Sequence, residues 1–114
     1  DVVRGDDLVP STPRQLLLYR ALGWDAPAFA HLPLVVGEDG RRLAKRHGDT
    51  RLAALREAGV RPEAVVGLLA WSCGWLSEAR PATPRELVRR FRLDAIPPRP
   101  FVLTAASLKG IGYG

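Results

Sequence analysis

Proline and glycine divide this chain into short segments, and their distribution limits the possible folds more than any other feature. The 114 residues include 10 prolines and 11 glycines. Thr12-Pro13 and Thr83-Pro84 are strong helix starts, because threonine can cap a helix and proline fits its first turn. Gly23 is a helix stop, since glycine readily adopts the left-handed conformation at a helix end. The pattern predicts several short helices.

The second half of the chain is predicted to be mainly helical. Asp49 or Thr50 can cap a helix that ends at Gly59, and Pro62 opens a second helix that runs towards Leu76. This second helix is apolar nearly all round, so we expect it to be the central core helix of this half.

The first part of the chain combines strands with one helix. Val2 and Val3 are typical of the end of a short buried strand, and residues 32–36 of a second extended segment. Thr12 begins the helix, and Gln15 can complete a capping box three residues on. We therefore expect a mainly α protein with a small α/β part. A fold that begins at a strand leaves sheet edges unpaired, so we also expect a preceding part to be missing.

Two further segments carry turn or breaker signals. Gly-Glu-Asp-Gly at residues 37–40 predicts a tight hairpin, because Asp-Gly favours such turns. From Asp94 onwards prolines interrupt the chain, and we expect an extended surface segment. Gly-Ile-Gly-Tyr-Gly at residues 110–114 is no dinucleotide fingerprint, since no strand is expected before it and no helix after it. Residues 101–114 are therefore predicted to be a tail.

The apolar pattern and the single cysteine limit where in the cell the protein is expected and which sites it could hold. No apolar run approaches the ~20 residues that a membrane span needs. One cysteine, Cys73, excludes an internal disulfide and a cysteine-based zinc site. It lies in an apolar stretch with no positive neighbour to lower its pKa, so we expect a buried core thiol and not a nucleophile. These features favour the cytoplasm and predict neither membrane contact nor a metal site.

The charge of the chain permits RNA binding without requiring it. Lysine and arginine outnumber aspartate and glutamate by 17 to 12, and nearly all the cations are arginines. The planar fork of arginine suits phosphate, and a basic surface attracts polyanions. Arg85, Arg89 and Arg90 follow the helix start at Thr83 and are candidate phosphate contacts, with a solvated helix face as the equal alternative. A GC-rich genome would also raise the arginine content.

The densest cationic segment is Gly-Arg-Arg-Leu-Ala-Lys-Arg-His-Gly at residues 40–48. It packs four cationic side chains into six residues between two glycines. A run of this kind is usually a solvated turn. It can also be a loop that closes over the phosphates of a nucleotide and stabilises the charge that develops as pyrophosphate leaves. The neighbouring motifs favour the second interpretation.

Three motifs precede the basic run in a fixed order. They are Val-Val-Arg-Gly-Asp-Asp-Leu at residues 2–8, Ser-Thr-Pro-Arg-Gln at 11–15, and Ala-His-Leu-Pro-Leu-Val-Val-Gly at 30–37. Together with the basic run they resemble the second half of the catalytic domain of glutamyl-type class I aminoacyl-tRNA synthetases. The resemblance implies that residues 1–48 form the C-terminal end of a Rossmann-type catalytic domain. It implies a helical tRNA-contacting region in residues 49–100, with Arg85, Arg89 and Arg90 as the candidate tRNA contacts.

The resemblance assigns the catalytic work to the basic loop, residues 41–47. Arg-Leu-Ala-Lys-Arg matches the Lys-Met-Ser-Lys-Ser signature loop of the family. Lys45, Arg42 and Arg46 would be the catalytic cations, and Lys45 would bind the ATP phosphates. Ala44 stands where the family has serine, which removes one hydroxyl from the loop.

The other motifs imply substrate contacts. Arg4 would pair with the substrate glutamate, since a guanidinium suits a carboxylate. Leu34 and Val35 would meet the adenine of ATP through their backbone. His31 is expected to be a structural hydrogen-bonding residue rather than a general base.

The resemblance also implies the reaction and its partners. These are ATP with Mg²⁺, L-glutamate, tRNA and the N-terminal half of the catalytic domain, without which the 114 residues would be inactive. The chain is most similar to the shortened glutamyl-Q tRNA(Asp) branch of the family, which transfers glutamate to queuosine of tRNA(Asp). A fragment of a standard glutamyl-tRNA synthetase and a non-catalytic basic RNA-binding module are the alternatives. A helix-turn-helix in residues 49–76 is disfavoured, because its second helix is too apolar for a DNA groove.

Overall fold

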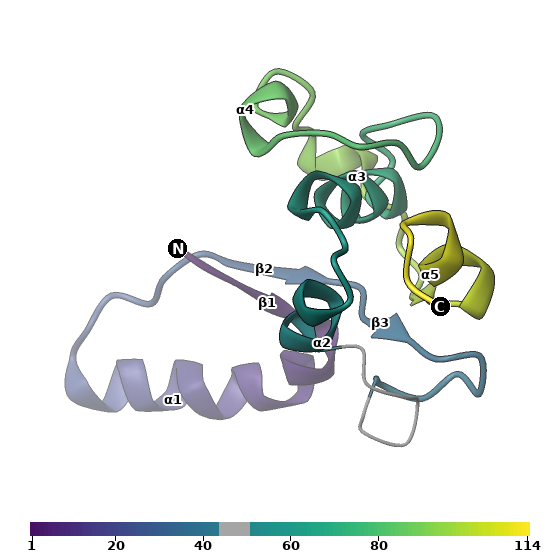
Figure 1. Cartoon of the computed structure of the whole chain (residues 1–114). Coiled ribbons are helices and arrows are strands. Elements are labelled where there is room, and N and C mark those ends of the chain that lie inside the picture. The colour runs from purple at the N-terminus through teal and green to yellow at the C-terminus, as the bar shows by residue number, and fades with distance from the viewer. Residues whose placement is uncertain (44–50) are drawn as a thin grey trace. The chain divides into compact units, whose positions relative to one another are not determined.

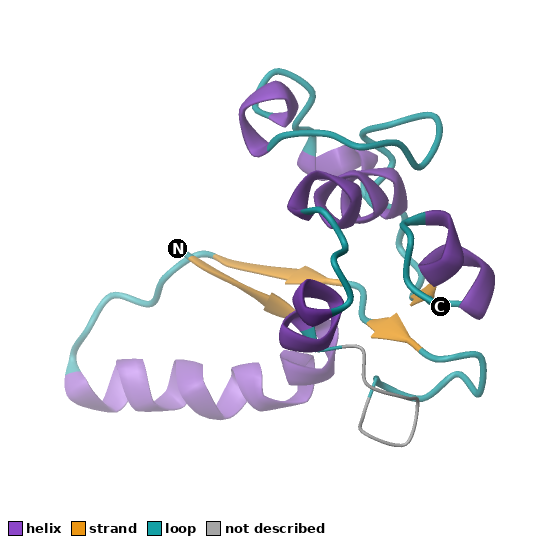
Figure 2. Ribbon diagram, viewed as in Figure 1, coloured by secondary structure: helices purple, strands orange, loops and turns teal. Residues whose placement is uncertain are grey.

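The chain forms two compact units, Asp1–Leu34 and Val35–Gly114. The computed structural model describes residues 1–43 and 51–114. Short helices accompany one two-stranded parallel sheet in each unit, as Figures 1 and 2 show. The predicted combination of helices with a small α/β part is therefore confirmed for the described residues. The domain boundary predicted at residue 48 falls in the segment outside them and stays a prediction.

The first unit is a strand–helix–strand arrangement. Strand β1 (Val2–Gly5) pairs in parallel with β2 (Phe29–Leu32), and α1 (Thr12–Leu22) connects them. A 3₁₀ helix, η1 (Asp6–Ser11), leads from β1 directly into α1. Parallel neighbours need a crossover of this kind, because a tight hairpin can join only antiparallel strands. Gly23 ends α1 with a φ of 67°, as predicted.

The capping box predicted for Thr12 and Gln15 is wrong. A capping residue needs an extended backbone, but η1 runs into α1 without a break. Ser11 and Thr12 consequently both have right-handed helical backbone angles, and no side chain caps α1. The side chains of Thr12 and Gln15 bind a residue of β1 instead.

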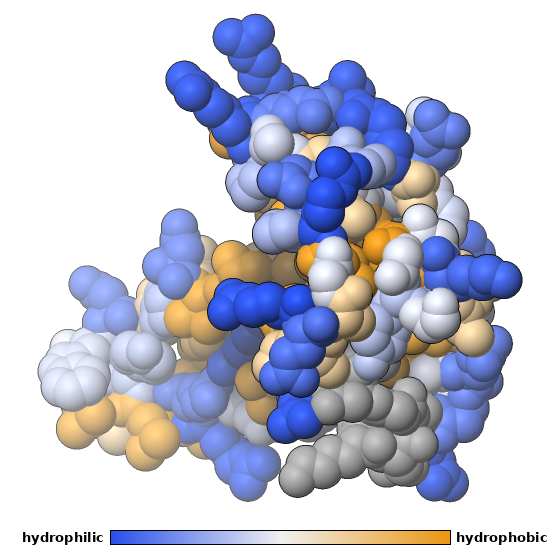
Figure 3. Space-filling view, viewed as in Figure 1, coloured by the Kyte–Doolittle hydropathy of each residue, from blue (hydrophilic) through white to orange (hydrophobic). Residues whose placement is uncertain are grey.

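Apolar side chains of the first unit remain at the surface. None of residues 1–34, all of which the structure describes, is buried. On and just after α1, Leu17, Leu18 and Trp24 expose 64%, 62% and 64% of their surface. In Figure 3 orange, apolar atoms lie over α1. Parallel sheets normally have both faces covered, whereas this unit exposes apolar side chains.

The second unit contains a sheet of residues far apart in sequence. Strand β3 (Val35–Val36) pairs in parallel with β4 (Phe101–Val102). The hairpin predicted after β3 is confirmed: the Gly40 amide donates to the Gly37 carbonyl at 2.9 Å, and Val36 forms an antiparallel bridge with Arg42. The basic run thus begins on the returning side of this hairpin.

The helices of the second unit are short, as the proline and glycine pattern predicted. Within residues 51–114 they are α2 (Leu52–Glu57), α3 (Pro62–Ser72), α4 (Pro84–Leu87), the 3₁₀ helix η3 (Leu93–Ala95) and α5 (Ala105–Gly110). Helix α3 begins at the predicted Pro62, and Thr83 caps α4 by accepting a hydrogen bond from the Glu86 amide. The residue that precedes α2 is Arg51, which makes no side-chain cap. The expected caps, Asp49 and Thr50, lie outside the described residues.

The buried core of the second unit surrounds one face of α3. Its buried cluster consists of Ala70, Leu76, Ala82 and Leu87, with Val66 and Trp75 packed against it. Helix α3 is therefore a core helix, as predicted, but it is not buried all round, since Leu69 on its other side is exposed. The segment after α3 returns along the helix, where the Ala82 amide donates to the Glu63 carbonyl at 2.9 Å.

The prediction of a tail in residues 101–114 is wrong. This segment supplies β4 and α5, and Thr104 caps α5 by accepting a hydrogen bond from the Ser107 amide at 3.1 Å. The proline-rich segment before residue 101 is followed by a strand, because β3 offers β4 a pairing partner that is distant in sequence. No helix in the described part of the chain is long and apolar enough to cross a membrane.

Candidate functional site

The polar side chains of the first unit converge on Arg4 near the end of β1. Arg4 Nε donates to His31 Nε2 at 3.1 Å. Its two terminal nitrogens donate to Gln15 Oε1 at 2.7 Å and to Thr12 Oγ1 at 2.8 Å. The guanidinium also lies over the Phe29 ring, 4.6 Å from its centroid. All five residues are half-buried. They form one cluster, which we call the Arg4 cluster.

Strand register and helix periodicity explain this convergence. Arg4 and His31 are direct partners in the β1–β2 ladder, so their side chains emerge side by side. Phe29 is two residues before His31 and therefore lies on the same face of the sheet. Thr12 and Gln15 are three residues apart on the first turn of α1, which puts them on one face of that helix.

The hydrogen bond from Arg4 indicates the tautomer of His31. Because Arg4 has only donors, Nε2 of His31 is the acceptor in this bond, which places the ring proton on Nδ1. The Phe29 and His31 rings stack with their centroids 6.2 Å apart and their planes 13° apart. His31 is thus the structural hydrogen-bonding residue expected from the sequence.

Arg4 was predicted from the sequence as a site residue, but its partners were not predicted as a set. Thr12 and Gln15 were assigned to a capping box and His31 to an unspecified hydrogen bond. Their shared partner lies up to 27 residues away in sequence, and only the strand register brings it to them. The three-residue spacing of Thr12 and Gln15 was the one local signal that they share a helix face.

The other predicted active-site residues belong to other segments of the chain. Leu34 ends the first unit and Val35 begins β3 in the second. Arg42 lies on the hairpin opposite Val36. Lys45 and Arg46 lie outside the described residues, as does Ala44.

The predicted tRNA contacts do lie together. Arg85, Arg89 and Arg90 are exposed and line a groove of about 620 Å³ with Thr83 and Glu86. In Figure 3 blue, hydrophilic atoms gather over α4, where this groove lies. The groove is therefore a predominantly cationic surface.

One carboxylate lies among these arginines. Glu86 pairs with Arg80 at 2.6 Å. The hydrogen bond from Arg80 lowers the pKa of Glu86, and the charges of Arg80 and Arg90 act in the same direction. Glu86 is therefore paired with Arg80, and the three arginines of the groove face solvent.

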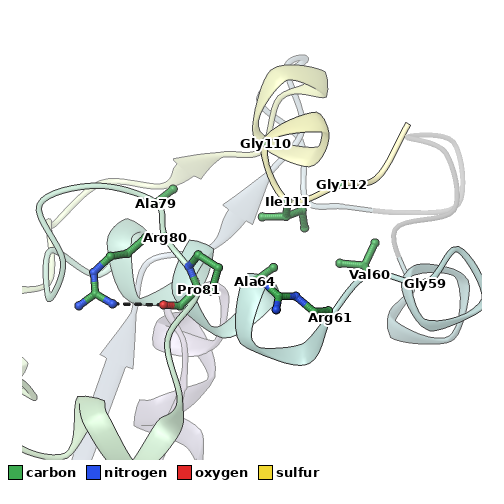
Figure 4. A pocket seen from close by; sticks show the side chains of 10 residues that line it. All are labelled: Gly59, Val60, Arg61, Ala64, Ala79, Arg80, Pro81, Gly110, Ile111 and Gly112. Carbon is green, nitrogen blue, oxygen red and sulfur yellow. Dashed lines mark hydrogen bonds between the residues drawn. The ribbon is translucent and has the colours of Figure 1, made fainter.

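A second hollow of about 400 Å³ lies between the α2–α3 turn, residues 79–81 and the end of α5. Figure 4 shows Ile111 pointing towards the segment that carries Val60 and Ala64. The Arg80 guanidinium donates to the Pro81 carbonyl at 3.1 Å at its margin. The lining is mostly small and apolar, and it holds no arrangement of acid, base and nucleophile among the described residues.

The remaining reactive groups of residues 1–43 and 51–114 show no catalytic arrangement. Cys73 is half-buried, and burial raises the pKa of its thiol, although a hydrogen bond with Ser72 opposes this effect. A raised thiol pKa disfavours the nucleophilic thiolate, in line with the expected structural role. Across residues 1–43 and 51–114, no three His, Cys, Asp or Glu side chains are grouped as they would be around a metal ion.

Comparison with known proteins identifies the family. The model of the catalytic domain of class I tRNA synthetases (E and Q) matches residues 1–94. A glutamyl-Q tRNA(Asp) synthetase of Symbiobacterium thermophilum is 51% identical over 99% of this chain and 35% of its own length. A glutamate–tRNA ligase 2 of Rubrobacter xylanophilus is 40% identical over 96% of this chain and 22% of its own.

Solved structures agree with the sequence relatives. A glutamate tRNA ligase from Elizabethkingia meningosepticum, solved in complex with its amino acid, is 31% identical. It superposes with a TM-score of 0.75 over 95% of this chain and 25% of its own. The chain thus spans about a third or less of the length of these relatives. Within that span, it belongs to the family of class I tRNA synthetases of the E and Q type, in the part that forms their catalytic domain.

Proposed function

We propose that this chain is part of an ATP-dependent ligase that activates L-glutamate and transfers it to queuosine of tRNA(Asp). The observation that carries the proposal is the Arg4 cluster, in which a half-buried guanidinium is held in place by hydrogen bonds from its own N–H groups to uncharged side chains. A fixed guanidinium suits the recognition of a carboxylate, since it can offer two parallel donors. Arg4 would be the group that binds glutamate.

The activation step would depend on the basic loop. Attack of the glutamate α-carboxylate on ATP forms glutamyl-adenylate and releases pyrophosphate. Arg42, Lys45 and Arg46 would stabilise the charge on the departing phosphates. Arg42 follows the hairpin after β3, so the cationic segment starts from a turn with a defined geometry. The backbone at Leu34 and Val35 would contact the adenine.

The remainder of the catalytic domain would cover the first unit. The parallel sheet of the first unit has only two strands, and its helix α1 exposes a row of leucines. Covering such surface is favourable by roughly 25 cal/mol for each Å² of apolar area. The relatives are about three to five times as long as the matched segment, and the N-terminal half of the catalytic domain is the partner that we propose.

The groove at Arg85, Arg89 and Arg90 would contact tRNA. Its arginines face solvent, and the described part of the groove contains one carboxylate, which is bound to Arg80. Phosphate contacts of this kind position a nucleic acid without reading its sequence. The groove would therefore contribute affinity, and the choice of tRNA would be made elsewhere.

The identity of the tRNA distinguishes two branches of the family. Two glutamyl-Q tRNA(Asp) synthetases are 51% and 64% identical to the chain, the second over 65% of its length. Over nearly the whole chain, the 51% of the first exceeds the 40% of the glutamate–tRNA ligase 2. Over about two thirds of the chain, the 64% of the second exceeds the 51% of another glutamate–tRNA ligase, and both differences support the glutamyl-Q assignment. A standard glutamyl-tRNA synthetase is the second candidate, because relatives of that kind also match nearly the whole chain.

The test is glutamate transfer by the complete reading frame that encodes this chain. We expect labelled glutamate to attach to queuosine-containing tRNA(Asp), and not to the same tRNA without queuosine or to tRNA(Glu). Transfer to tRNA(Glu) would support the second candidate. Absence of both transfer and glutamate-dependent ATP–pyrophosphate exchange would contradict the ligase and favour a non-catalytic RNA-binding module.

A further inference from the structure

The three acceptors of Arg4 share a chemical property that the binding of glutamate does not by itself require. His31 offers a ring nitrogen, Gln15 an amide oxygen and Thr12 a hydroxyl, and none of these groups is anionic. A buried or half-buried arginine is more commonly fixed by a carboxylate, whose hydrogen bonds are stronger. Across residues 1–43 and 51–114, no carboxylate forms an ion pair with Arg4, so the described contacts hold its guanidinium without neutralising it.

The Arg4 guanidinium has more N–H donors than its three partners use. A guanidinium has five N–H groups, one on Nε and two on each terminal nitrogen. Within the described residues, one donor on each of the three nitrogens is used. One N–H on each terminal nitrogen remains, and these two nitrogens are the pair that can meet both oxygens of a carboxylate.

The supports of the guanidinium come from different elements, which makes the fixation rigid. His31 projects from β2, whereas Thr12 and Gln15 project from α1. Thr12 Oγ1 accepts from Arg4 and lies 3.3 Å from both the Leu8 carbonyl and His31 Nε2, so its own proton also has an acceptor. Torsion of the Arg4 side chain would break bonds on both elements at once.

We propose that Thr12, Gln15 and His31 are positioning residues whose lack of negative charge is a functional requirement. They hold the Arg4 guanidinium in one orientation and leave its positive charge for the carboxylate of the incoming amino acid. This inference rests on the proposed function, because it takes that ligand to be glutamate. It predicts that an added negative charge in the cluster harms substrate binding even if it strengthens the fold.

The decisive comparison is Gln15→Glu against Gln15→Met in the complete reading frame. Glutamate at position 15 keeps an acceptor near the Arg4 terminal nitrogen but adds a competing charge, whereas methionine keeps the size and removes the acceptor. We expect Gln15→Glu to raise the KM for L-glutamate in ATP–pyrophosphate exchange by about tenfold or more, with a melting temperature equal to or above wild type. Gln15→Met should raise KM less and lower the melting temperature.

A purely structural role makes the opposite prediction. If the cluster only supports the fold, Gln15→Glu, which preserves the hydrogen bond, should be the milder variant in KM. That ranking, or equal effects of the two variants, would overturn the proposal. If position 15 tolerates no change, Thr12→Ser and Thr12→Val provide a second pair of variants. We expect the KM for L-glutamate to stay near wild type in Thr12→Ser and to rise in Thr12→Val. A larger rise in KM for Thr12→Ser than for Thr12→Val would also contradict the proposal.

A spectroscopic measurement separates this inference from the proposed function. ¹⁵N NMR of the labelled full-length protein should show His31 with its proton on Nδ1 and an Arg4 Nε–H protected from exchange. Loss of that protection in the His31→Phe variant, which retains the ring beside Phe29, is expected. A proton on Nε2 of His31, or unchanged protection in His31→Phe, would refute the positioning role whether or not the protein activates glutamate.

Discussion

The backbone carbonyl of Arg80 occupies the space that a Cβ atom on Gly67 would need. Gly67 is a buried residue in the middle of α3, and the chain segment that carries Arg80 crosses the helix at this point. Glycine normally weakens a helix interior, so its presence here is explained by the close approach and not by helix propensity. The two segments also share the hydrogen bond between the Ala82 amide and the Glu63 carbonyl.

Gly67→Ala is therefore expected to destabilise the protein although alanine is the better helix former. The added methyl group must displace backbone, and overpacking of this kind costs about 1–3 kcal/mol. Gly110→Ala is the matched control, because a Cβ atom at that helical position would meet nothing within 4 Å. Denaturant unfolding should show a loss for Gly67→Ala and no loss for Gly110→Ala. A stabilised Gly67→Ala protein would mean that residues 80–82 do not pack on α3 as described.

Arg4→Lys should impair glutamate binding although it keeps the charge. Lysine cannot supply three directed bonds to His31, Gln15 and Thr12 while offering two parallel donors to a carboxylate. We expect the KM for glutamate in ATP–pyrophosphate exchange to rise by about ten- to hundredfold, as charge-assisted hydrogen bonds are lost. Arg20→Lys, at an exposed position in the last turn of α1, is the control and should leave the KM for glutamate unchanged.

The same variant tests which carboxylate Arg4 recognises. If Arg4 pairs with the side-chain carboxylate, Arg4→Lys should narrow the preference for glutamate over glutamine, which differs from it only at that group. An equal loss for both amino acids would show that the residue meets a group common to them.

Local chemistry determined which parts of the fold could be predicted. The start of α3 at Pro62, the cap at Thr83 and the turn after Gly37 depend on neighbouring residues alone, and each was predicted from the sequence. Pairing between β3 and β4 depends on residues from opposite ends of the second unit, and nothing near Phe101 signals it. The prediction of a tail in residues 101–114 was wrong for that reason.

The Arg4 cluster illustrates the same limit at the level of a site. The motif around Arg4 was sufficient to single it out. The roles of Thr12 and Gln15 were misassigned because a capping box is a local device, while the backbone of η1 removes the extended residue that it needs. The side chains then became acceptors for a residue whose position only the sheet register defines.

Lys45→Ala in the complete reading frame should remove most of the turnover and leave stability and tRNA affinity close to wild type. An ammonium group that acts on the departing pyrophosphate stabilises the transition state, and losing such a group costs on the order of 100-fold or more in kcat. Lys109→Ala, at the other lysine of the chain in the last turn of α5, is the control and should retain full turnover. A Lys45→Ala protein with normal kcat and weaker RNA binding would favour a binding role for the basic run.

The groove beside α4 predicts a salt-dependent contribution to tRNA binding. Each phosphate that Arg85, Arg89 or Arg90 neutralises releases counterions, so each contact adds about 0.7–0.9 to the slope of log affinity against log salt concentration. Replacing all three with glutamine should weaken tRNA binding by the complete protein and reduce this slope. The loss should be similar for different tRNAs, because phosphate contacts carry no sequence information.

Arg92→Gln is the matched control for the groove. Arg92 is also an exposed arginine of this region, but its Nε and a terminal nitrogen donate to the two carboxylate oxygens of Asp94, at 3.0 and 2.7 Å. This pairing lowers the pKa of Asp94, and the resulting anion offsets the Arg92 charge before any RNA approaches. Arg92→Gln should therefore change the salt slope less than any single groove substitution. An equal effect would mean that tRNA responds to the overall basicity of the protein, and that the groove formed by Arg85, Arg89 and Arg90 is not a binding surface of its own.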